Sequence, residues 1–339
     1  MRKPVILITG ANGEIGHGLI RSLSKKGGPP IVALDINQLD SSLNDNVRDA
    51  ILGNVLDRNL LERLNAEFEI SAIYHLAAVL STRAEFSPMT AHHVNVGGTI
   101  NMLDLAMEQA ASRKKTVQFF FPSSIAVYGM GGGENKGSAG SITEDDFGHP
   151  ETMYGCNKLH CENLGIYFSN HYKRLSVESS AGLVDFRAIR FPGLISAHTL
   201  PSGGTTDYGP EMIHAAAQSQ PYSCFVSEIT ALPFMTMPDA IRAIVQLMNT
   251  PPDNLSRSVY HIMAFSAAAH QFKEKIVSYF PEAEIEFSIS DKRQSIVDGW
   301  PAEVDDSGAR RDWGWNPEHD FESAFDDYLI PEIRRRYAG

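Results

Sequence analysis

A glycine-rich turn placed directly after an apolar run is the feature that most constrains this chain. Residues 5–9 are largely apolar and predict a buried strand, and residues 10–16 read Gly-Ala-Asn-Gly-Glu-Ile-Gly before a helical pattern that continues to Lys26. The glycines allow a tight turn and a close backbone approach, while the N-terminus of the helix favours a bound negative charge. This segment therefore predicts a strand–turn–helix unit that can hold the pyrophosphate of a dinucleotide.

An acidic residue at the end of the next predicted strand supports this interpretation. Asp35 follows the apolar run 31–34 and lies 19 residues after Gly16, where its carboxylate can accept hydrogen bonds from both hydroxyls of an adenosine ribose. The same carboxylate would repel a 2′-phosphate, and neither Ile36 nor Asn37 supplies an arginine to bind one. NAD is thus favoured over NADP. A glycine-rich turn without a ligand is the alternative.

The first half of the chain alternates predicted strands and helices. Such alternation produces a parallel sheet covered by helices on both faces, so the expected fold class is α/β: a doubly wound parallel sheet (Rossmann) with a smaller mixed α/β substrate-binding region. We expect an NAD-binding Rossmann domain over 1–193 and a mainly substrate-binding region over 194–339 that is interleaved with the sheet. The expected strands are 5–9, 31–34, 50–52, 72–76, 117–121, 186–191 and 259–263, and the expected helices are 14–26, 58–68, 89–111, 152–172, 237–248 and one after 321.

Composition excludes several classes of partner. The 339 residues are 43% hydrophobic and 21% charged with a formal net charge of −12, which argues against nucleic acid or an anionic membrane as the main partner. No run approaches the roughly 18 apolar residues of a membrane span, and the apolar N-terminal stretch is too short for a signal peptide.

No metal is expected, because the 12 histidines form no ligand pair such as HExxH. We expect a cytoplasmic protein with buried, reduced thiols at Cys156, Cys161 and Cys224.

A tyrosine and a lysine share one face of the predicted helix 152–172. Tyr154 and Lys158 are four residues apart and so lie on the same side of a helix. A phenol with a pKa of about 10 is a poor base at neutral pH, but a nearby ammonium and a positive nicotinamide ring both favour the phenolate. Ser124, after the predicted strand 117–121, can hydrogen-bond the reacting oxygen beside Tyr154. Such pairs also occur on solvated helices, but together with the dinucleotide turn they predict redox chemistry at a carbinol carbon.

Three further segments bear on the site. Residues 75–78 read His-Leu-Ala-Ala, and these small residues leave room for a cofactor to cross the strand ends, where open α/β sheets bind ligands; simple close packing is the alternative. Asn95 could contact the cofactor or brace the site as a polar helix residue. Residues 129–141 contain six glycines and predict a flexible loop, either a lid or a plain surface insertion.

In this order, the glycine turn, Asp35, the segment 75–78, Ser124 and the Tyr154/Lys158 pair resemble the extended short-chain dehydrogenase/reductase (NAD-dependent epimerase/dehydratase) superfamily. Segments of the second half look like the signatures of short-chain-type L-threonine 3-dehydrogenases, and the similarity runs almost end to end. The chain departs from that family at Asn54, where an Asp is usual near the adenine, and around Arg83, where a glycine is missing. The signature segments are Arg-Phe-Pro-Gly-Leu-Ile-Ser at 190–196, Leu-Pro-Ser-Gly-Gly-Thr-Thr-Asp-Tyr at 200–208, Leu-Pro-Phe-Met-Thr-Met-Pro-Asp-Ala-Ile-Arg at 232–242 and Asp-Gly-Trp-Pro at 298–301.

The resemblance implies NAD-dependent oxidation of the β-hydroxyl of L-threonine to 2-amino-3-oxobutanoate, with Tyr154 as the base and hydride passing from Cβ to the nicotinamide. The implied catalytic residues are Ser124, Tyr154 and Lys158. The expected cofactor-binding residues are Gly10, Asn12, Gly13, Glu14, Ile15, Gly16, Asp35, Asn54, Val55, Leu76, Ala77, Ala78, Asn95, Tyr154, Lys158 and Phe191. The expected substrate-binding residues are Ser81, Ser124, Tyr154, Gly193, Thr205, Thr206 and Trp300.

Two other function classes stay open. A sugar-nucleotide epimerase or dehydratase would use the same Ser/Tyr/Lys set but would want convergent arginines for its diphosphate substrate. A dinucleotide-sensing binding protein would not need an intact Tyr154/Lys158 pair. The arginines available for a diphosphate are Arg187, Arg190, Arg293 and Arg310.

The resemblance also suggests a homodimer in which the predicted helices near 95–110 and 152–172 pair across a two-fold axis. The alternative is that the apolar residues of these helices only face the sheet. The residues concerned are Ile100, Leu103, Met107, Leu159 and Tyr167.

Overall fold

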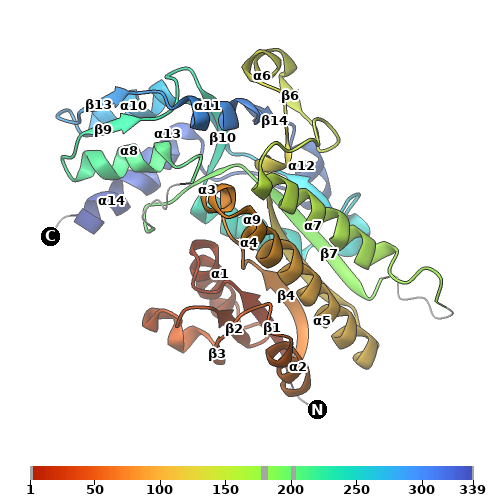
Figure 1. Ribbon diagram of the computed structural model, residues 1–339. Coiled ribbons are helices and arrows are strands. Elements are labelled where there is room, and N and C mark those ends of the chain that lie inside the picture. Colours follow the sequence, from red (N-terminus) through yellow and green to blue (C-terminus); the bar gives the residue numbers. More distant parts are fainter. Residues whose placement is uncertain (1–2, 177–181, 200–203, 338–339) are drawn as a thin grey trace.

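The computed structural model describes residues 3–176, 182–199 and 204–337. Within this part of the chain the central element is a seven-stranded sheet of order β11-β7-β5-β4-β1-β2-β3 (Figure 1), in which every pair of neighbours is parallel. The predicted doubly wound α/β fold is confirmed. The strands are β1 (Pro4–Thr9), β2 (Ile31–Asp35), β3 (Asp49–Leu52), β4 (Glu69–His75), β5 (Val117–Ser124), β7 (Val184–Phe191) and β11 (Val259–His261).

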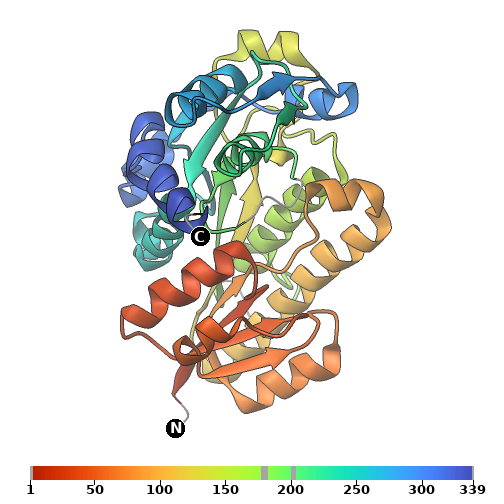
Figure 2. The same cartoon turned by 90° about the vertical axis from the view of Figure 1, so that its left-hand side faces the viewer.

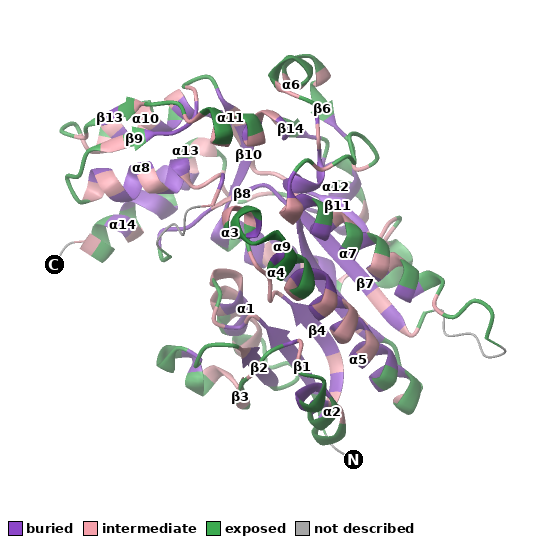
Figure 3. Ribbon diagram, in the orientation of Figure 1, coloured by how far each residue is buried: buried purple, intermediate pink, exposed green. Residues whose placement is uncertain are grey.

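Helices cover both faces of this sheet (Figures 1 and 2), which explains why its strands are almost continuously apolar rather than alternating. Figure 3 shows the strands buried beneath the helices. One face is covered by α2 (Arg58–Glu67), α5 (Gly98–Arg113) and α7 (Met153–Asn170). The other face is covered by α1 (Glu14–Lys25) and α9 (Met237–Asn249).

The second half of the chain adds smaller sheets beside the carboxyl ends of the strands. In the described residues β8 (Gly193–Ile195) pairs in parallel with β10 (Ala231–Thr236), and β10 pairs antiparallel with β12 (Phe265–Ala268). A separate apolar core fills this region and contacts Tyr154. The remaining elements are η1 (Ser41–Asn46), η3 (Ile125–Val127), β6 (Ser141–Ile142), α8 (Tyr208–Ala217), β9 (Tyr222–Cys224), η4 (Pro252–Asn254), α10 (Ala269–Tyr279), β13 (Ile285–Phe287), α11 (Asp291–Asp298), β14 (Glu303–Val304), α12 (Ser307–Trp313), α13 (Phe321–Ser323), η5 (Ala324–Leu329) and α14 (Ile330–Tyr337).

Two predictions of local structure are wrong. The glycine-rich stretch 129–141 is not a plain flexible loop, because it contains helix α6 (Gly133–Ala139). Lys136 of this helix donates a hydrogen bond from Nζ to the Val297 carbonyl oxygen at 2.9 Å, which holds α6 against the end of α11. The single helix expected over 89–111 is divided, and a π-helical turn separates its two α-helical parts. The two parts are α4 (Pro88–His92) and α5, and the turn between them is η2 (His93–Gly97). A further short helix, α3 (Ser81–Phe86), precedes α4.

The cysteines depart in part from expectation. Cys161 and Cys224 are buried, whereas Cys156 on α7 is exposed, and all of these thiols are free. The prediction that Cys156 is buried is therefore wrong.

Across 3–176, 182–199 and 204–337, helices long and apolar enough to cross a bilayer are absent.

Candidate active site

The glycine turn lies at the point where the strand order reverses, between β1 and β4, which is where open α/β sheets bind ligands. Gly10 has a φ of +64°, and a Cβ there would lie 2.6 Å from the backbone nitrogen of Ala77. A Cβ on Gly16 would lie 2.4 Å from the Ala11 carbonyl oxygen. Only glycine fits these two positions, so the turn forms a cradle of bare backbone beside Leu76 and Ala77.

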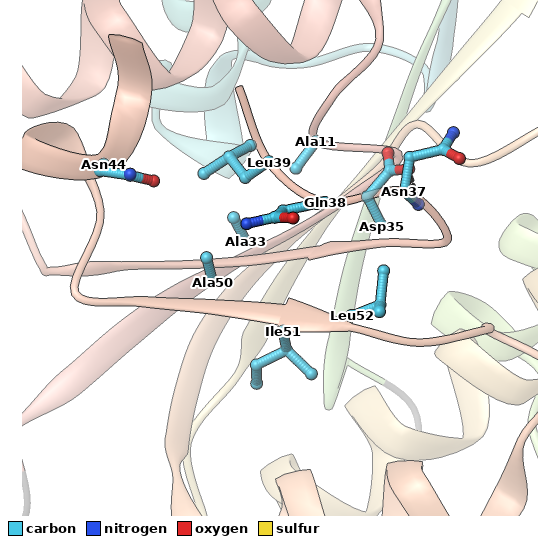
Figure 4. A pocket seen from close by; sticks show the side chains of 10 residues that line it. All are labelled: Ala11, Ala33, Asp35, Asn37, Gln38, Leu39, Asn44, Ala50, Ile51 and Leu52. Atoms are coloured by element: carbon cyan, nitrogen blue, oxygen red, sulfur yellow. Dashed lines mark hydrogen bonds between the residues drawn. The ribbon is translucent and has the colours of Figure 1, made fainter. Parts of the chain in front are cut away.

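Asp35 closes the other side of this cradle. One carboxylate oxygen accepts a hydrogen bond from the backbone N–H of Asn12 at 2.9 Å, and the other accepts one from Asn37 at 2.9 Å. Each oxygen keeps a second lone pair for a ribose hydroxyl. Figure 4 shows the pocket that opens beside this carboxylate, and the residues present fit an adenosine. The lining residues are Ala11, Ala33, Asp35, Asn37, Gln38, Leu39, Asn44, Ala50, Ile51 and Leu52.

Asn54 and Val55 lie outside the wall of this pocket. Asn54 is exposed, and its side-chain oxygen accepts a hydrogen bond from the Leu56 N–H at 3.0 Å, closing a local turn. Val55 is buried, and it lies under Gly98, where an added Cβ would meet its side chain at 2.8 Å. Their expected contact with the cofactor stays a prediction.

The Tyr154/Lys158 pair is held at the beginning of α7. Thr152 caps the helix by accepting a hydrogen bond from Gly155 N–H at 3.1 Å, and Glu85 of α3 accepts one from Met153 N–H at 2.7 Å. The Lys158 ammonium lies 5.3 Å from the centre of the Tyr154 ring. These contacts fix the two side chains on one helix face, as the spacing predicts. Sequence reasoning missed Glu85, because its partner is 68 residues away.

The electrostatics of the pair differ from the expectation. Burial raises the pKa of the Tyr154 phenol above its ordinary value of 10. Burial lowers the pKa of the Lys158 ammonium to about 8, although the nearby Cys161 and Glu162 act in the opposite direction. Lys158 also donates a hydrogen bond to the carbonyl oxygen of Pro122. Burial therefore dominates the pKa of Tyr154 among the protein groups, and the expectation that Lys158 and the nicotinamide ring together favour the phenolate stays a prediction.

Ser124 is the last residue of β5 and is half-buried. Its hydroxyl oxygen accepts a hydrogen bond from Ala126 N–H at 3.1 Å, which begins the short helix η3. In the sheet register Ser124 lies opposite Phe191, the buried last residue of β7. Both expected site residues thus lie at the carboxyl edge of the sheet.

A buried ionic network that sequence reasoning missed lies behind the pair. Arg190 of β7 makes a bidentate ion pair with Glu162 of α7, at 2.9 Å and 2.7 Å, and Ser123 donates a hydrogen bond to the same carboxylate. The network joins β5, β7 and α7. The spacing of Glu162, four residues after Lys158, was an available signal, since it predicts a carboxylate on the same helix face.

The expected substrate residues come from distant parts of the chain. The Thr205 hydroxyl lies 3.4 Å from the hydroxyl of Ser81, although 124 residues separate them. Trp300 is buried in the same apolar core that Tyr154 contacts. Gly193 is buried against Phe234, where an added Cβ would lie 2.4 Å from the ring. Thr206 is half-buried, and the first part of its signature, 200–203, lies outside the described residues.

His75 and Asn95 brace the site. The His75 Nδ1 lies 2.7 Å from the Thr9 hydroxyl oxygen, and burial lowers the pKa of its imidazole to about 3, so the ring is neutral. Asn95 accepts a hydrogen bond from Val79 N–H at 2.7 Å and donates one to the Val79 carbonyl at 3.0 Å. Since both the oxygen and the nitrogen of the Asn95 amide are hydrogen-bonded to Val79, the alternative that Asn95 braces the site is favoured.

Among the described residues, clusters of three or more His, Cys, Asp or Glu side chains suited to a metal ion are absent.

Comparison with known proteins agrees with this geometry. The profile of the NAD dependent epimerase/dehydratase family matches residues 6–262. The mitochondrial L-threonine 3-dehydrogenase of Bos taurus is 34% identical over 318 residues, which cover 94% of this chain and 79% of that protein. The X-ray structure of L-threonine dehydrogenase from Clostridium difficile superposes with a TM-score of 0.85 at 32% identity, covering 100% of both chains.

A monomeric L-threonine 3-dehydrogenase from a metagenome, in its apo form, superposes with a TM-score of 0.83 at 35% identity, covering 97% of this chain and 99% of the other. The family profile spans well over half of this chain, and the similarity to the dehydrogenases extends over nearly its whole length. The chain therefore belongs to the NAD-dependent epimerase/dehydratase family, and L-threonine 3-dehydrogenases are among its full-length relatives.

Proposed function

We propose that this protein is an NAD-dependent L-threonine 3-dehydrogenase that oxidises the β-hydroxyl of L-threonine to 2-amino-3-oxobutanoate. The observation that carries the proposal is the convergence of three features at one edge of the sheet. These are the glycine cradle with Asp35, the Tyr154/Lys158 pair, and the contact between Ser81 and Thr205. The cradle and Asp35 would hold the cofactor, and Ser81, Thr205, Thr206, Gly193 and Trp300 would form the amino-acid pocket.

Bound NAD would supply the acceptor for the hydride that leaves Cβ of threonine. Tyr154 takes the proton of the β-hydroxyl while Ser124 donates a hydrogen bond to the same oxygen, and the carbon–oxygen bond becomes a carbonyl. Because burial raises the pKa of the phenol, the phenolate needs positive charge beside it. Lys158 supplies one such charge, and the nicotinamide ring of the oxidised cofactor supplies the other.

The alternative of a sugar-nucleotide substrate finds little support in the arginines. Arg187 pairs with Asp185 at 2.6 Å, Arg190 with Glu162 at 2.7 Å, and Arg310 with Asp306 at 2.6 Å. Arg293 lies 4.2 Å from the centre of the Phe225 ring. Three of these side chains pair with a carboxylate of the protein and Arg293 contacts an aromatic ring, which favours the dehydrogenase over an enzyme that uses them to bind a diphosphate. A sensing role would leave the Tyr154/Lys158 pair without a use.

A parallel assay separates these functions. The purified protein is given NAD with L-threonine, L-allo-threonine, L-serine or UDP-glucose, and NADH formation is followed by absorbance, with conversion of UDP-glucose measured by chromatography. We expect NADH with L-threonine above all. Epimerisation of UDP-glucose without net NADH formation would replace the proposal with the epimerase alternative, and binding of NAD without turnover of any substrate would favour sensing.

A further inference from the structure

Glu14, the first residue of α1, is an acid in the middle of the glycine turn. The free N–H groups and the dipole at a helix N-terminus ordinarily stabilise a carboxylate there. Here burial outweighs that effect and raises the pKa of the carboxyl above its ordinary value of 4.5. Within the described residues, the Oε1 atom of Glu14 is buried and has no hydrogen-bond partner. Glu14 is thus half-buried, with one carboxyl oxygen buried and without a hydrogen-bond partner.

The groups around Glu14 come from the second half of the chain. The side chains of Ser196 and Thr199 act to lower the pKa of the carboxyl, whereas the like charge of Asp207, next to α8, acts to raise it. His198 acts in the opposite direction, but its ring is 63% exposed and lies 4.0 Å from the carboxylate of Glu332.

Two more titratable groups lie near the turn. The phenol of Tyr328, from η5, interacts with the charge of Glu14 and accepts a hydrogen bond from Ala197 N–H at 3.2 Å. His17, one turn along α1, lies 3.1 Å from the side-chain oxygen of Asn12 and interacts with Asp35 and Asp40. His17 thus interacts with groups on the adenosine side of the turn. Among the described residues, Glu14 forms no ion pair with a cationic side chain.

The same helix N-terminus and glycine cradle would hold the negative pyrophosphate of a dinucleotide. A carboxylate at that position would repel it, whereas a neutral carboxyl would not. We propose that Glu14 takes up a proton when the cofactor binds, so that this residue couples cofactor affinity to pH. The inference rests on the proposed function only for the class of cofactor.

The direction in which the Kd for the cofactor changes with pH follows from the change in the pKa of the Glu14 carboxyl on binding. Binding of the pyrophosphate raises the pKa of Glu14 beyond its already raised value, so the complex holds the proton over a range of pH in which the free protein has lost it. Within that range the Kd for the cofactor rises by up to about tenfold per pH unit, and below that range it is constant. An amide at this position carries no charge and removes the coupling.

The test measures the Kd of NADH and of ADP-ribose by fluorescence and calorimetry from about pH 5 to about pH 7, above the ordinary pKa of a glutamate carboxyl and below the pKa of about 8 of Lys158. Wild type is compared with Glu14→Gln and with Glu134→Gln, which removes the same charge from an exposed position on α6. We expect the Kd of both ligands to rise with pH for wild type and Glu134→Gln, and to vary less than about twofold for Glu14→Gln. ADP-ribose contains the pyrophosphate but no nicotinamide, so it separates the phosphate effect from the ring.

A Glu14→Gln variant whose Kd keeps the wild-type dependence on pH would overturn the inference while leaving the proposed cofactor intact. Failure of NADH to bind wild type at any pH would overturn both. Should the variant fail to fold, wild-type calorimetry in buffers of different ionisation enthalpy gives the proton count directly. Uptake of a fraction of a proton up to one supports the inference, and zero uptake across the whole pH range overturns it.

Discussion

At the scale of single residues, the surroundings of a side chain decide what its chemistry can be. Tyr154 and Lys158 have the spacing of a proton-transfer pair. Burial nevertheless raises the pKa of the phenol and lowers the pKa of the ammonium, so it favours the neutral form of each side chain. Such opposed shifts are expected where a protein excludes water from reacting groups. The pair is then ready to respond to a positive charge brought in by the cofactor.

Replacing Tyr154 by Phe keeps the ring but removes the group that takes the proton. We expect kcat with L-threonine to fall on the order of 10²–10⁴-fold, the usual loss for a general base, while NADH still binds. Tyr167→Phe, on an exposed tyrosine of the same helix, is the matched control and should behave as wild type. Retention of more than about a tenth of kcat in Tyr154→Phe would mean that another group is the base.

Asp35 should set the choice of cofactor. Its carboxylate lies where a 2′-phosphate would meet a like charge, and such juxtapositions cost several kcal/mol. We expect kcat/KM for NAD to exceed that for NADP by at least about a hundredfold, since each factor of ten corresponds to about 1.4 kcal/mol. Asp35→Asn removes the negative charge and keeps an acceptor oxygen for only one of the two backbone N–H groups, and it should narrow the ratio. Equal values for the two cofactors in wild type would remove Asp35 from this role.

His75 should make the protein sensitive to acid. Its pKa is lowered to about 3 by burial and by the charge of Lys158, against 6.5 for an exposed histidine. As the pH falls below 6.5 the unfolded chain binds a proton that the folded protein does not, so the free energy of unfolding falls. From about pH 7 to about pH 5 this amounts to about 2 kcal/mol.

The measurement for His75 is urea denaturation at both pH values in wild type and in His75→Gln, which can still hydrogen-bond Thr9. The variant should lose less stability than wild type by about the stated amount. Identical losses in the two proteins would show that the folded protein accepts the proton at His75 after all.

At the scale of elements, the site depends on how α7 is fastened to the sheet. The Ser123–Glu162–Arg190 network connects the ends of β5 and β7 to α7 within one turn of Lys158. Arg190 also donates a hydrogen bond to the Tyr128 hydroxyl at 3.1 Å and to the Glu144 carbonyl at 2.7 Å. All the polar groups of the guanidinium are thus engaged in the protein interior, and a loss of Glu162 would leave its charge without a counterion.

Glu162→Gln should therefore destabilise the protein strongly. Breaking a buried ion pair by removing one partner costs about 3–5 kcal/mol in the free energy of unfolding. Glu332→Gln breaks the pair with Arg335, whose side chain is 73% exposed, and should cost less than about 1 kcal/mol. Urea denaturation of both variants provides the comparison. A loss of less than about 1 kcal/mol for Glu162→Gln would show that the Arg190 charge is compensated by its other partners.

At the scale of the whole molecule, the helices α5 and α7 cover one face of the sheet, and their outward sides form part of the surface of the molecule. The structure corrects part of the proposed dimer contact, because Leu103 and Met107 are buried in the core beneath these helices. Ile100 and Leu159 are half-buried and also contact core residues. The exposed apolar side chains on this side are Tyr167 (42% exposed), Met89 (76%) and Phe86 (84%).

We propose that a second copy covers this face. Light scattering at micromolar concentration should then give twice the chain mass of 37.3 kDa, and Tyr167→Glu should shift the mass toward that of one chain. Ile229→Glu, on an exposed isoleucine elsewhere, is the control and should leave the mass unchanged. A monomer mass for wild type would reject the dimer. The chain would then resemble the metagenomic relative, which is monomeric.

The cytoplasmic location stays a prediction, because the bovine relative is mitochondrial.

The sequence by itself determined the features that depend on neighbouring residues. The glycine turn, the acid after the second strand and the four-residue spacing of Tyr154 and Lys158 are readable because backbone sterics and helix periodicity act over a few positions. The alternation of apolar runs with helical patterns likewise predicted a parallel sheet covered on both faces. Local composition misled the prediction at 129–141, where the contact of Lys136 with α11 stabilises a helix despite the glycines.

Only the tertiary structure decided which distant groups meet and how burial changes them. The contacts of Ser81 with Thr205, of Glu85 with α7 and of Glu162 with Arg190 join residues that no local pattern relates. The pKa shifts of Tyr154, Lys158 and His75 have burial as their largest cause. Burial is a property of the packed molecule, because the cost of a charge depends on the water that all the surrounding elements exclude together.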